Sequence, residues 1–191
     1  MSTQAKVFLT PEQYLEIERQ AERKSEYWQG EMFAMSGAAE SHNLLVMNIA
    51  AQIHSQLRTR DCRIYSNDMR VRVSATGLYT YPDIVVVCGV PQFLDGRRDT
   101  LLNPTLIIEV LSPSTEAYDR GRKFEHYQSI ESLKQYLLVA SERVHADLFT
   151  RQPGGQWLLT SAGSIEDTLD LESVGCRITL RDSYERVEFS S

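Results

Sequence analysis

The chain has 191 residues, of which 42% are hydrophobic and 24% are charged, and this composition is typical of soluble globular proteins rather than disordered or membrane-spanning ones. Its length allows one domain with a substantial core, so we expect a single domain over residues 1–191. The 26 acidic and 20 basic side chains give a formal net charge of −6, which argues against a protein that coats nucleic acid through bulk electrostatics.

The first predicted elements are a helix, a hairpin and a longer helix. The segment Thr10-Pro11-Glu12-Gln13 can cap a helix that runs to about Arg23, because Thr caps, Pro suits the first turn and Gln can reach back. Aromatic and apolar residues on both sides of Gln29-Gly30 predict a hairpin over residues 27–33. From Ser41 to Arg58, apolar residues recur at steps of three and four and predict an amphipathic helix: Leu45, Val46, Ile49, Ile53 and Leu57.

Three predicted strands come next. Residues 69–73 alternate between apolar and polar side chains, which predicts a strand with one face on the core. Two near-continuous apolar runs, Ile84 to Cys88 and Leu106 to Leu111, predict strands that are buried on both faces. These two strands should form the centre of the sheet.

The second half of the chain is predicted to begin with a helix from about Glu116 to Ile130, preceded by hydroxyl residues that can cap it. Tyr136 to Ala140 is another apolar strand. The residues on either side of Pro153-Gly154-Gly155 predict a further hairpin. The predicted order is therefore helix, three strands, helix and strand, with one hairpin before this core and strands after it.

The cysteines and the apolar runs bear on location. The cysteines Cys62, Cys88 and Cys176 are odd in number and widely separated, which predicts neither a disulfide framework nor a thiolate metal site and fits a reducing compartment. No apolar run approaches the roughly 20 residues of a bilayer-spanning helix, and Met1 to Lys6 lack the apolar core of a secretion signal. We therefore expect a cytoplasmic protein without a membrane partner.

Two acidic residues lie in apolar surroundings. Asp83 comes directly before the run Ile84 to Cys88, and Glu109 lies inside Leu106 to Leu111. An ionised carboxylate buried without a partner costs several kcal/mol, so each acid requires a cation, a metal or dense hydrogen bonding. Structural ion pairs or strand ends that face water are the alternative interpretation. The two acids together favour a shared chemical site.

These residues resemble a known group of nucleases. Tyr81-Pro82-Asp83 at a strand start and Glu109 in the next strand resemble the PD and (D/E) elements of the PD-(D/E)XK superfamily. The resemblance covers roughly residues 10–140 and implies an α/β (α+β) restriction-endonuclease-like core, a mixed β-sheet flanked by helices, with an added N-terminal helix and hairpin. A closer resemblance, to the Uma-two family of predicted endonucleases, rests on four segments: Glu26 to Glu31, Ser41 to Leu44, Tyr81 to Asp83 and Glu109 to Thr115.

The chain departs from the superfamily pattern at the lysine. That lysine is expected two residues after Glu109, where this sequence has Leu111. Asp119, Lys123 and Tyr127 are spaced four apart on one predicted helical face, so Lys123 could replace it if the helix packs back across the sheet. The alternative is that Asp119 and Lys123 form an ordinary surface pair. The resemblance implies a lysine that has migrated to the helix.

The resemblance also implies a site for Mg²⁺ or Mn²⁺, because these ions prefer hard oxygen ligands. Asp83 and Glu109 would be the metal ligands, and the catalytic residues would be these two acids and Lys123, whose ammonium offsets charge that grows on the phosphate. His42 has an alternative interpretation as a capping or half-buried histidine. The accessory candidates are Glu40, His42, Asp119 and Tyr127.

We therefore expect a metal-dependent endonuclease that hydrolyses phosphodiester bonds in DNA, with loss of cleavage but a largely intact fold in Lys123→Ala. A homodimer is expected, since a duplex requires two cuts and a two-fold partner supplies a second site. One rival is a catalytically degenerate nuclease fold that binds nucleic acid or a protein. A second is an assembly module whose acids are structural. A local basic patch could come from six arginines: Arg70, Arg72, Arg97, Arg98, Arg120 and Arg122.

Overall fold

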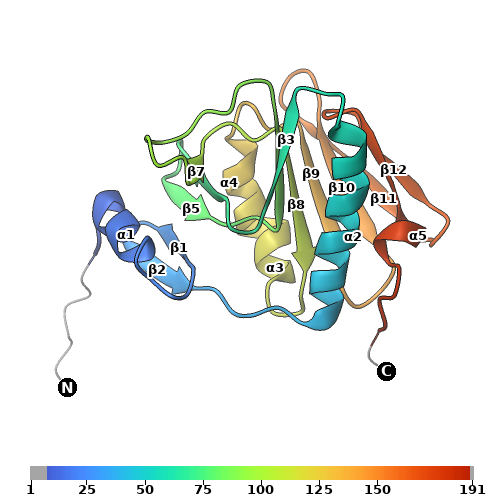
Figure 1. The fold of residues 1–191 in the computed structure, drawn as a ribbon, viewed down its shortest axis with the longest axis horizontal. Coiled ribbons are helices and arrows are strands. Elements are labelled where there is room, and N and C mark those ends of the chain that lie inside the picture. The colour runs from blue at the N-terminus through green and yellow to red at the C-terminus, as the bar shows by residue number, and fades with distance from the viewer. Residues whose placement is uncertain (1–7, 190–191) are drawn as a thin grey trace.

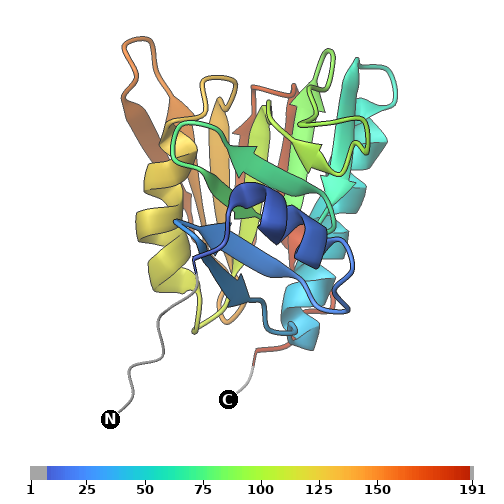
Figure 2. The same ribbon diagram turned by 90° about the vertical axis from the view of Figure 1, so that its left-hand side faces the viewer.

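The computed structural model describes residues 8–189 and shows a mixed α+β fold. Figure 1 shows a large central sheet with helix α2 on one side and the α3 to α4 region on the other, while the N-terminal helix and hairpin lie beside β5. Figure 2, turned by 90°, shows these N-terminal elements in front of the large sheet. The added helix and hairpin are therefore present, as the sequence predicts.

The helices and strands of the described residues follow one another along the chain, with the longest connection between β6 and β7. They are α1 (Pro11–Glu18), β1 (Ser25–Trp28), β2 (Glu31–Ala34), α2 (Glu40–Leu57), β3 (Cys62–Ser66), β4 (Arg70–Val73), β5 (Leu78–Thr80), β6 (Ile84–Cys88), β7 (Thr100–Leu101), β8 (Leu106–Leu111), α3 (Glu116–Tyr118), the π-helical segment η1 (Asp119–Lys123), α4 (Phe124–Gln128), β9 (Gln135–Ala140), β10 (Ala146–Arg151), β11 (Trp157–Ala162), β12 (Thr168–Leu171), β13 (Cys176–Thr179) and α5 (Leu180–Ser183).

The central sheet has six strands in the order β11-β10-β9-β8-β6-β3. Only β8 and β9 are parallel neighbours in it, and the other pairs are antiparallel. Every residue of β8 and β9 is buried, as are four of the five residues of β6. The two apolar runs are therefore central strands covered on both faces, which confirms the prediction.

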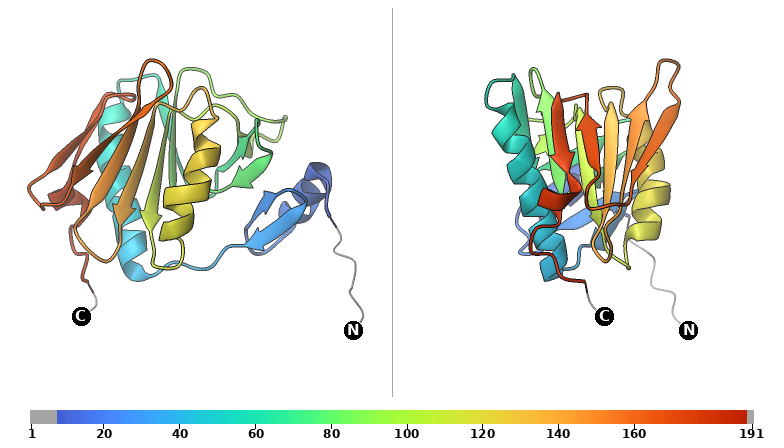
Figure 3. Two further views of the ribbon diagram at one scale, coloured as in Figure 1. Left: turned by 180° about the vertical axis from the view of Figure 1, so that it is seen from behind. Right: turned by 90° about the vertical axis from the view of Figure 1, so that its right-hand side faces the viewer.

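Side chains that alternate along β6 and β8 enter two different cores, because successive residues of a strand point to opposite faces. Ile84 and Ile108 face the core that contains α2 and the β12–β13 pair, whereas Val85 and Ile107 face the core that contains α4. Figure 3 shows α2, β12 and β13 on one side of the large sheet. The sheet is thus the middle layer of three.

The second sheet has five strands in the order β2-β1-β5-β4-β7 and carries the N-terminal elements. Tyr27 of β1 pairs with Tyr79 of β5, and their ring centroids lie 4.9 and 5.3 Å from that of Tyr14 on α1 and 5.7 Å from each other. The hairpin turns at Gln29 and Gly30, whose φ values of 49° and 88° suit a tight two-residue turn. This cluster fixes β1 to the rest of the protein.

The structure differs from the predicted elements at several points. Helix α1 has the predicted Thr10 capping box but ends at Glu18, and Arg19 after it forms ion pairs with Asp95 and Asp99. Strands β5 and β7 were not predicted because they have only three and two residues, and β3 was not predicted because none of its side chains is fully buried. The helix predicted from Glu116 contains a π-helical segment in its middle.

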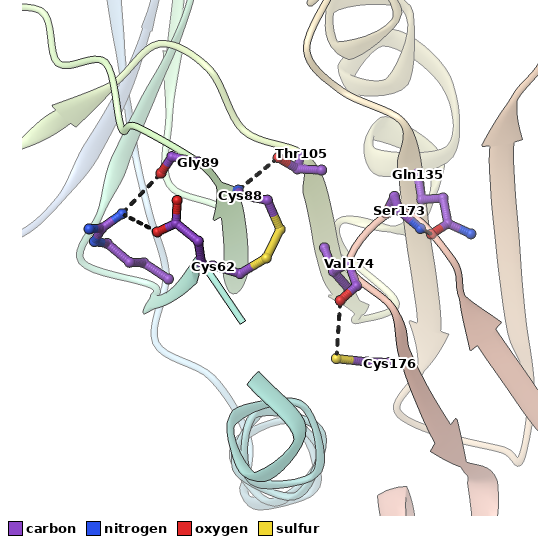
Figure 4. The surroundings of a disulfide bond; sticks show 10 residues. Cys62, Cys88, Gly89, Thr105, Gln135, Ser173, Val174 and Cys176 are labelled. Atoms are coloured by element: carbon purple, nitrogen blue, oxygen red, sulfur yellow. Dashed lines mark hydrogen bonds and ion pairs between the residues drawn. A yellow bond between two sulfur atoms is a disulfide. The ribbon is translucent and has the colours of Figure 1, made fainter. Parts of the chain in front are cut away.

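The cysteine prediction is wrong, because Cys62 and Cys88 form a disulfide in the structure. They are 26 residues apart in the sequence but lie opposite each other in the antiparallel pair of β3 and β6, with Cα atoms 3.9 Å apart. Figure 4 shows the bond between these strands, with Cys176 separate and hydrogen-bonded to the carbonyl of Val174. The cysteines therefore no longer support a reducing compartment.

The helices within residues 8–189 are all too short or too polar to cross a bilayer.

The disulfide predicts a specific thiol count. In denaturant without reductant, one thiol per chain should react with Ellman's reagent, and three should react after reduction. Closing a loop of this size stabilises a protein by about 3 kcal/mol, so reductant should lower the melting temperature of the wild type. Reductant should not change the melting temperature of the double variant Cys62→Ser/Cys88→Ser, which has no disulfide to lose. Three reactive thiols before reduction would contradict the pairing.

Candidate active site

Asp83 and Glu109 lie opposite each other where the β6–β8 pairing ends, directly before the first residue of β6. The register pairs Ile84 with Ile108, and one further step along it places Asp83 across from Glu109. Directly opposite residues of an antiparallel pair point to the same face of the sheet. The backbone N–H of Asp83 approaches Glu109 Oε2 at 3.4 Å, and Asp83 Oδ2 accepts a 2.8 Å hydrogen bond from the N–H of Val110. The two acids therefore belong to one site.

Glu109 is a carboxylate buried inside an apolar strand, with 4% of its surface exposed. Its Oε1 accepts a hydrogen bond from the Tyr127 hydroxyl at 2.9 Å and lies 2.9 Å from the Lys123 ammonium. Its Oε2 accepts the long hydrogen bond from Asp83. One oxygen of Glu109 is thus well satisfied, and the other retains capacity for a ligand.

The π-helical segment explains why Asp119, Lys123 and Tyr127 lie on one side of the helix, where Lys123 and Tyr127 contact Glu109 and Asp119 contacts Lys123. In a regular α-helix, residues eight positions apart point about 80° away from each other. A wider π turn over Asp119–Lys123 offsets this drift. The structure therefore brings together the three side chains that the sequence placed on one helical face.

Lys123 is the centre of an ion-pair network. Its ammonium lies 2.9 Å from Glu109, 3.2 Å from Asp119 and 3.4 Å from Glu26, and only 5% of the residue is exposed. The position in line with the superfamily lysine is held by Leu111, which is buried in the core that contains α4. The ammonium thus comes from the helix and not from the strand, and its role in catalysis stays a prediction.

Glu26 was missed among the site residues predicted from sequence. It lies on β1, which has no apolar surroundings of the kind that drew attention to Asp83 and Glu109. The segment Glu26 to Glu31 carries part of the family resemblance, but nothing in its spacing indicates contact with Lys123. Only the docking of the N-terminal hairpin brings it to the site.

His42 joins the site and Glu40 does not. His42 Nε2 lies 3.1 Å from Asp83 Oδ1, because the first turn of α2 faces the start of β6. Burial lowers the pKa of His42, but the hydrogen bond and charge of Asp83 outweigh burial and hold the pKa above its usual value. Glu40 is exposed, and within residues 8–189 no hydrogen bond or ion pair joins it to these side chains.

The site carries more negative than positive charge. Four carboxylates, those of Glu26, Asp83, Glu109 and Asp119, surround the ammonium of Lys123 and the ring of His42. Burial raises the pKa of Glu109, Lys123 lowers it, and Asp119 and Asp83 raise it further, with a net upward shift. The pKa of Asp119 is also raised, chiefly by burial. Despite burial, the carboxylates hold the pKa of Lys123 well above its usual value.

A divalent cation fits this donor set. A cation at Asp83 and Glu109 would offset the excess negative charge and use the oxygen of Glu109 that is poorly satisfied. In the described part of the chain, no group of three or more His, Cys, Asp or Glu side chains forms a ready-made cage. Mg²⁺ requires no such cage, since it keeps several waters and is commonly bound by one or two carboxylates and substrate phosphates.

Three of the six arginines proposed as a basic patch have other partners. Arg70 is 4% exposed and donates to the Tyr81 hydroxyl, while Arg120 forms ion pairs with Glu116 and Asp147. The guanidinium of Arg122 lies over the Trp28 ring at 4.0 Å. These three side chains therefore support the structure around the site.

A family model and two related proteins each match most of this chain. A model of the Uma2 family, described as "Putative restriction endonuclease", matches residues 11–181. Two Synechocystis proteins are each 36% identical: slr1290 over 95% of this chain and 94% of its own length, and sll1609 over 80% and 86%. Both carry the description "Uncharacterized protein".

A solved structure shares the fold. The crystal structure of "a putative nuclease belonging to DUF820" from Anabaena variabilis matches 94% of this chain and 99% of its own, with a TM-score of 0.75 and 15% identity. This likeness confirms the fold class that the sequence predicts.

The burial of Lys123 changes what its removal should do. Lys123→Met leaves buried carboxylates without their cation, so we expect the unfolding free energy to fall by about 3–5 kcal/mol in urea titrations. Lys123→Ala removes the same cation and should be destabilised by a similar amount. The matched control is Lys134→Met at an exposed position, which should stay within about 0.5 kcal/mol of the wild type. Equal stability of the two variants would contradict the network.

Proposed function

Because the chain belongs to the Uma2 family, described as "Putative restriction endonuclease", we propose that it is a metal-dependent endonuclease that hydrolyses phosphodiester bonds in DNA. The observation that carries this proposal is the convergence of three groups from separate elements. Asp83 precedes β6, Glu109 lies in β8, and Lys123 reaches Glu109 from η1 at 2.9 Å. Two oxygen ligands beside one buried ammonium form a set suited to a phosphate diester.

Asp83 and Glu109 would hold Mg²⁺ or Mn²⁺ in this proposal. Such an ion, when bound, lowers the pKa of a water molecule and stabilises charge on the attacked phosphate and the leaving oxygen. Asp83 is prepared for this role because its Oδ2 is fixed by the Val110 N–H and its Oδ1 by His42. His42 therefore acts on the orientation of Asp83.

Lys123 would stabilise the charge that develops on the phosphate. If Glu109 held a cation, its carboxylate would share less charge with Lys123, and the ammonium would then have an N–H to donate to a phosphate oxygen or a water. Asp119 and Glu26 continue to hold the nitrogen. A donor preorganised in a buried site stabilises the transition state without reorganisation.

DNA as the substrate and a homodimer as the active assembly are parts of the same proposal. Two sites related by a two-fold axis would match the two strands of a duplex. The rival function is that of a degenerate nuclease fold that binds nucleic acid or a protein. Such a protein would not cleave DNA, whereas the proposed endonuclease would.

Metal binding tests the two acids directly. Calorimetric titration with Mg²⁺ or Mn²⁺ should show binding to the wild type, and Asp83→Asn or Glu109→Gln should weaken it at least tenfold, because each removes one of only two protein ligands. The control is Glu142→Gln, a substitution at an exposed residue, which should bind metal like the wild type. Unchanged affinity in both site variants would remove Asp83 and Glu109 as ligands.

Turnover separates the two functions. Supercoiled plasmid should be nicked or linearised with Mg²⁺ and stay intact with EDTA, with single-stranded DNA and RNA run in parallel. Lys123→Arg keeps the positive charge but cannot place a compact ammonium, so the rate should fall by about 10²-fold. A wild type that binds metal and nucleic acid yet cleaves none of these substrates would favour the degenerate fold.

A further inference from the structure

Glu26 belongs to the N-terminal hairpin, yet its carboxylate lies in the site. Its Oε1 is 3.4 Å from the Lys123 ammonium, and 12% of its side chain is exposed. We propose that Glu26 is a positioning residue that fixes the Lys123 ammonium for phosphodiester hydrolysis. This inference rests on the proposed function and extends the site from the central sheet to the second sheet.

The alternation along β1 places Glu26 on the side of the helix. Tyr27 points to Tyr14 and Tyr79, so its neighbours Glu26 and Trp28 point to the opposite side of the strand. Trp28 contacts the helix that carries Lys123, because Arg122 and His126 both lie against its ring, at 4.0 and 5.5 Å. The hairpin is thus docked on this helix through the Trp28 ring and through the ion pair of Glu26 with Lys123.

Two neutral donors orient the Glu26 carboxylate. The Thr80 hydroxyl donates to its Oε1, and the Tyr118 hydroxyl donates to its Oε2 at 3.2 Å. Thr80 lies on β5 in the second sheet, and Tyr118 lies directly before the π-helical segment. One donor therefore comes from the sheet that carries Glu26, and the other comes from the helix that carries Lys123. The carboxylate therefore has a fixed direction, which a surface glutamate lacks.

A fixed carboxylate is what the Lys123 side chain requires. Lysine has a flexible stem, and the Lys123 ammonium forms ion pairs with carboxylates from three elements: Glu109 on β8, Asp119 on η1 and Glu26 on β1. Asp119 shares the helical segment with Lys123, and Glu109 is shared with the cation in the proposed mechanism. Glu26 is then the partner of Lys123 that is neither on its own segment nor a proposed metal ligand.

Kinetics test whether Glu26 acts through Lys123. Glu26→Gln should lower kcat about tenfold, in the range found when groups that orient a site residue are removed, with KM for DNA and Mg²⁺ affinity unchanged. In a Lys123→Arg background the same substitution should cause no further loss. Glu16→Gln, at an exposed position of α1, is the matched control and should match the wild type. Equal losses in both backgrounds would overturn the proposal.

A second readout does not depend on turnover. In metal-free protein with ¹⁵N-labelled lysine, the Nζ signal that disappears in Lys123→Arg belongs to Lys123. Glu26→Gln should shift or broaden this signal and Glu16→Gln should not. Tyr118→Phe removes the hydroxyl that donates to Glu26 and keeps the ring that lies 5.9 Å from the Lys123 ammonium. It should act in the same direction with a smaller loss of kcat, and it replaces Glu26→Gln if that variant does not fold. An unchanged Lys123 signal would overturn the positioning role.

The two readouts separate this inference from the proposed function. If the wild type cleaves no substrate, the proposed function fails and with it the catalytic purpose of Glu26. The Lys123 signal then still decides whether Glu26 fixes the ammonium. If the wild type cleaves and the Lys123 signal does not respond to Glu26→Gln, only the inference about Glu26 fails.

Discussion

A carboxylate inside the central strand of a sheet is the constraint on which this structure depends. Glu109 sits among apolar neighbours on β8, where burial of an unpaired charge would cost several kcal/mol. The protein meets this demand with groups from outside the strand: the ammonium of Lys123 and the hydroxyl of Tyr127. The packing of the helix against the sheet is therefore electrostatic at this point as well as apolar.

Asp83 and Glu109 together link the layers of the fold. Asp83 lies at the connection between β5 and β6, where the chain passes from the five-stranded to the six-stranded sheet. His42 approaches it from α2 on one side, and Lys123 approaches Glu109 from η1 on the other. The site thus forms where the three layers and the second sheet meet. A shift of any one layer would change the distances between these side chains.

Much of this arrangement could be predicted from the sequence, because the apolar runs of β6 and β8 define the sheet centre and isolate two acids within it. The capping box at Thr10 and the period of α2 were equally visible. The disulfide and Glu26 were not, because both depend on which strands become neighbours, and no local pattern encodes this pairing. The π-helical segment could not be predicted either, because side chains four residues apart, such as Asp119 and Lys123, also lie on one face of a regular α-helix.

Leu111 holds the position two residues after Glu109, and the ammonium beside Glu109 comes from η1 instead. A lysine in line with Glu109 would fix the distance between the two groups by the strand geometry alone, whereas here 14 positions and a turn at residues 112–115 separate Glu109 from Lys123. Such an arrangement keeps the two groups close in space without a constant spacing along the chain. A sequence motif that requires the acid and the lysine to be two residues apart would not match this protein, although a carboxylate and an ammonium lie side by side in its fold.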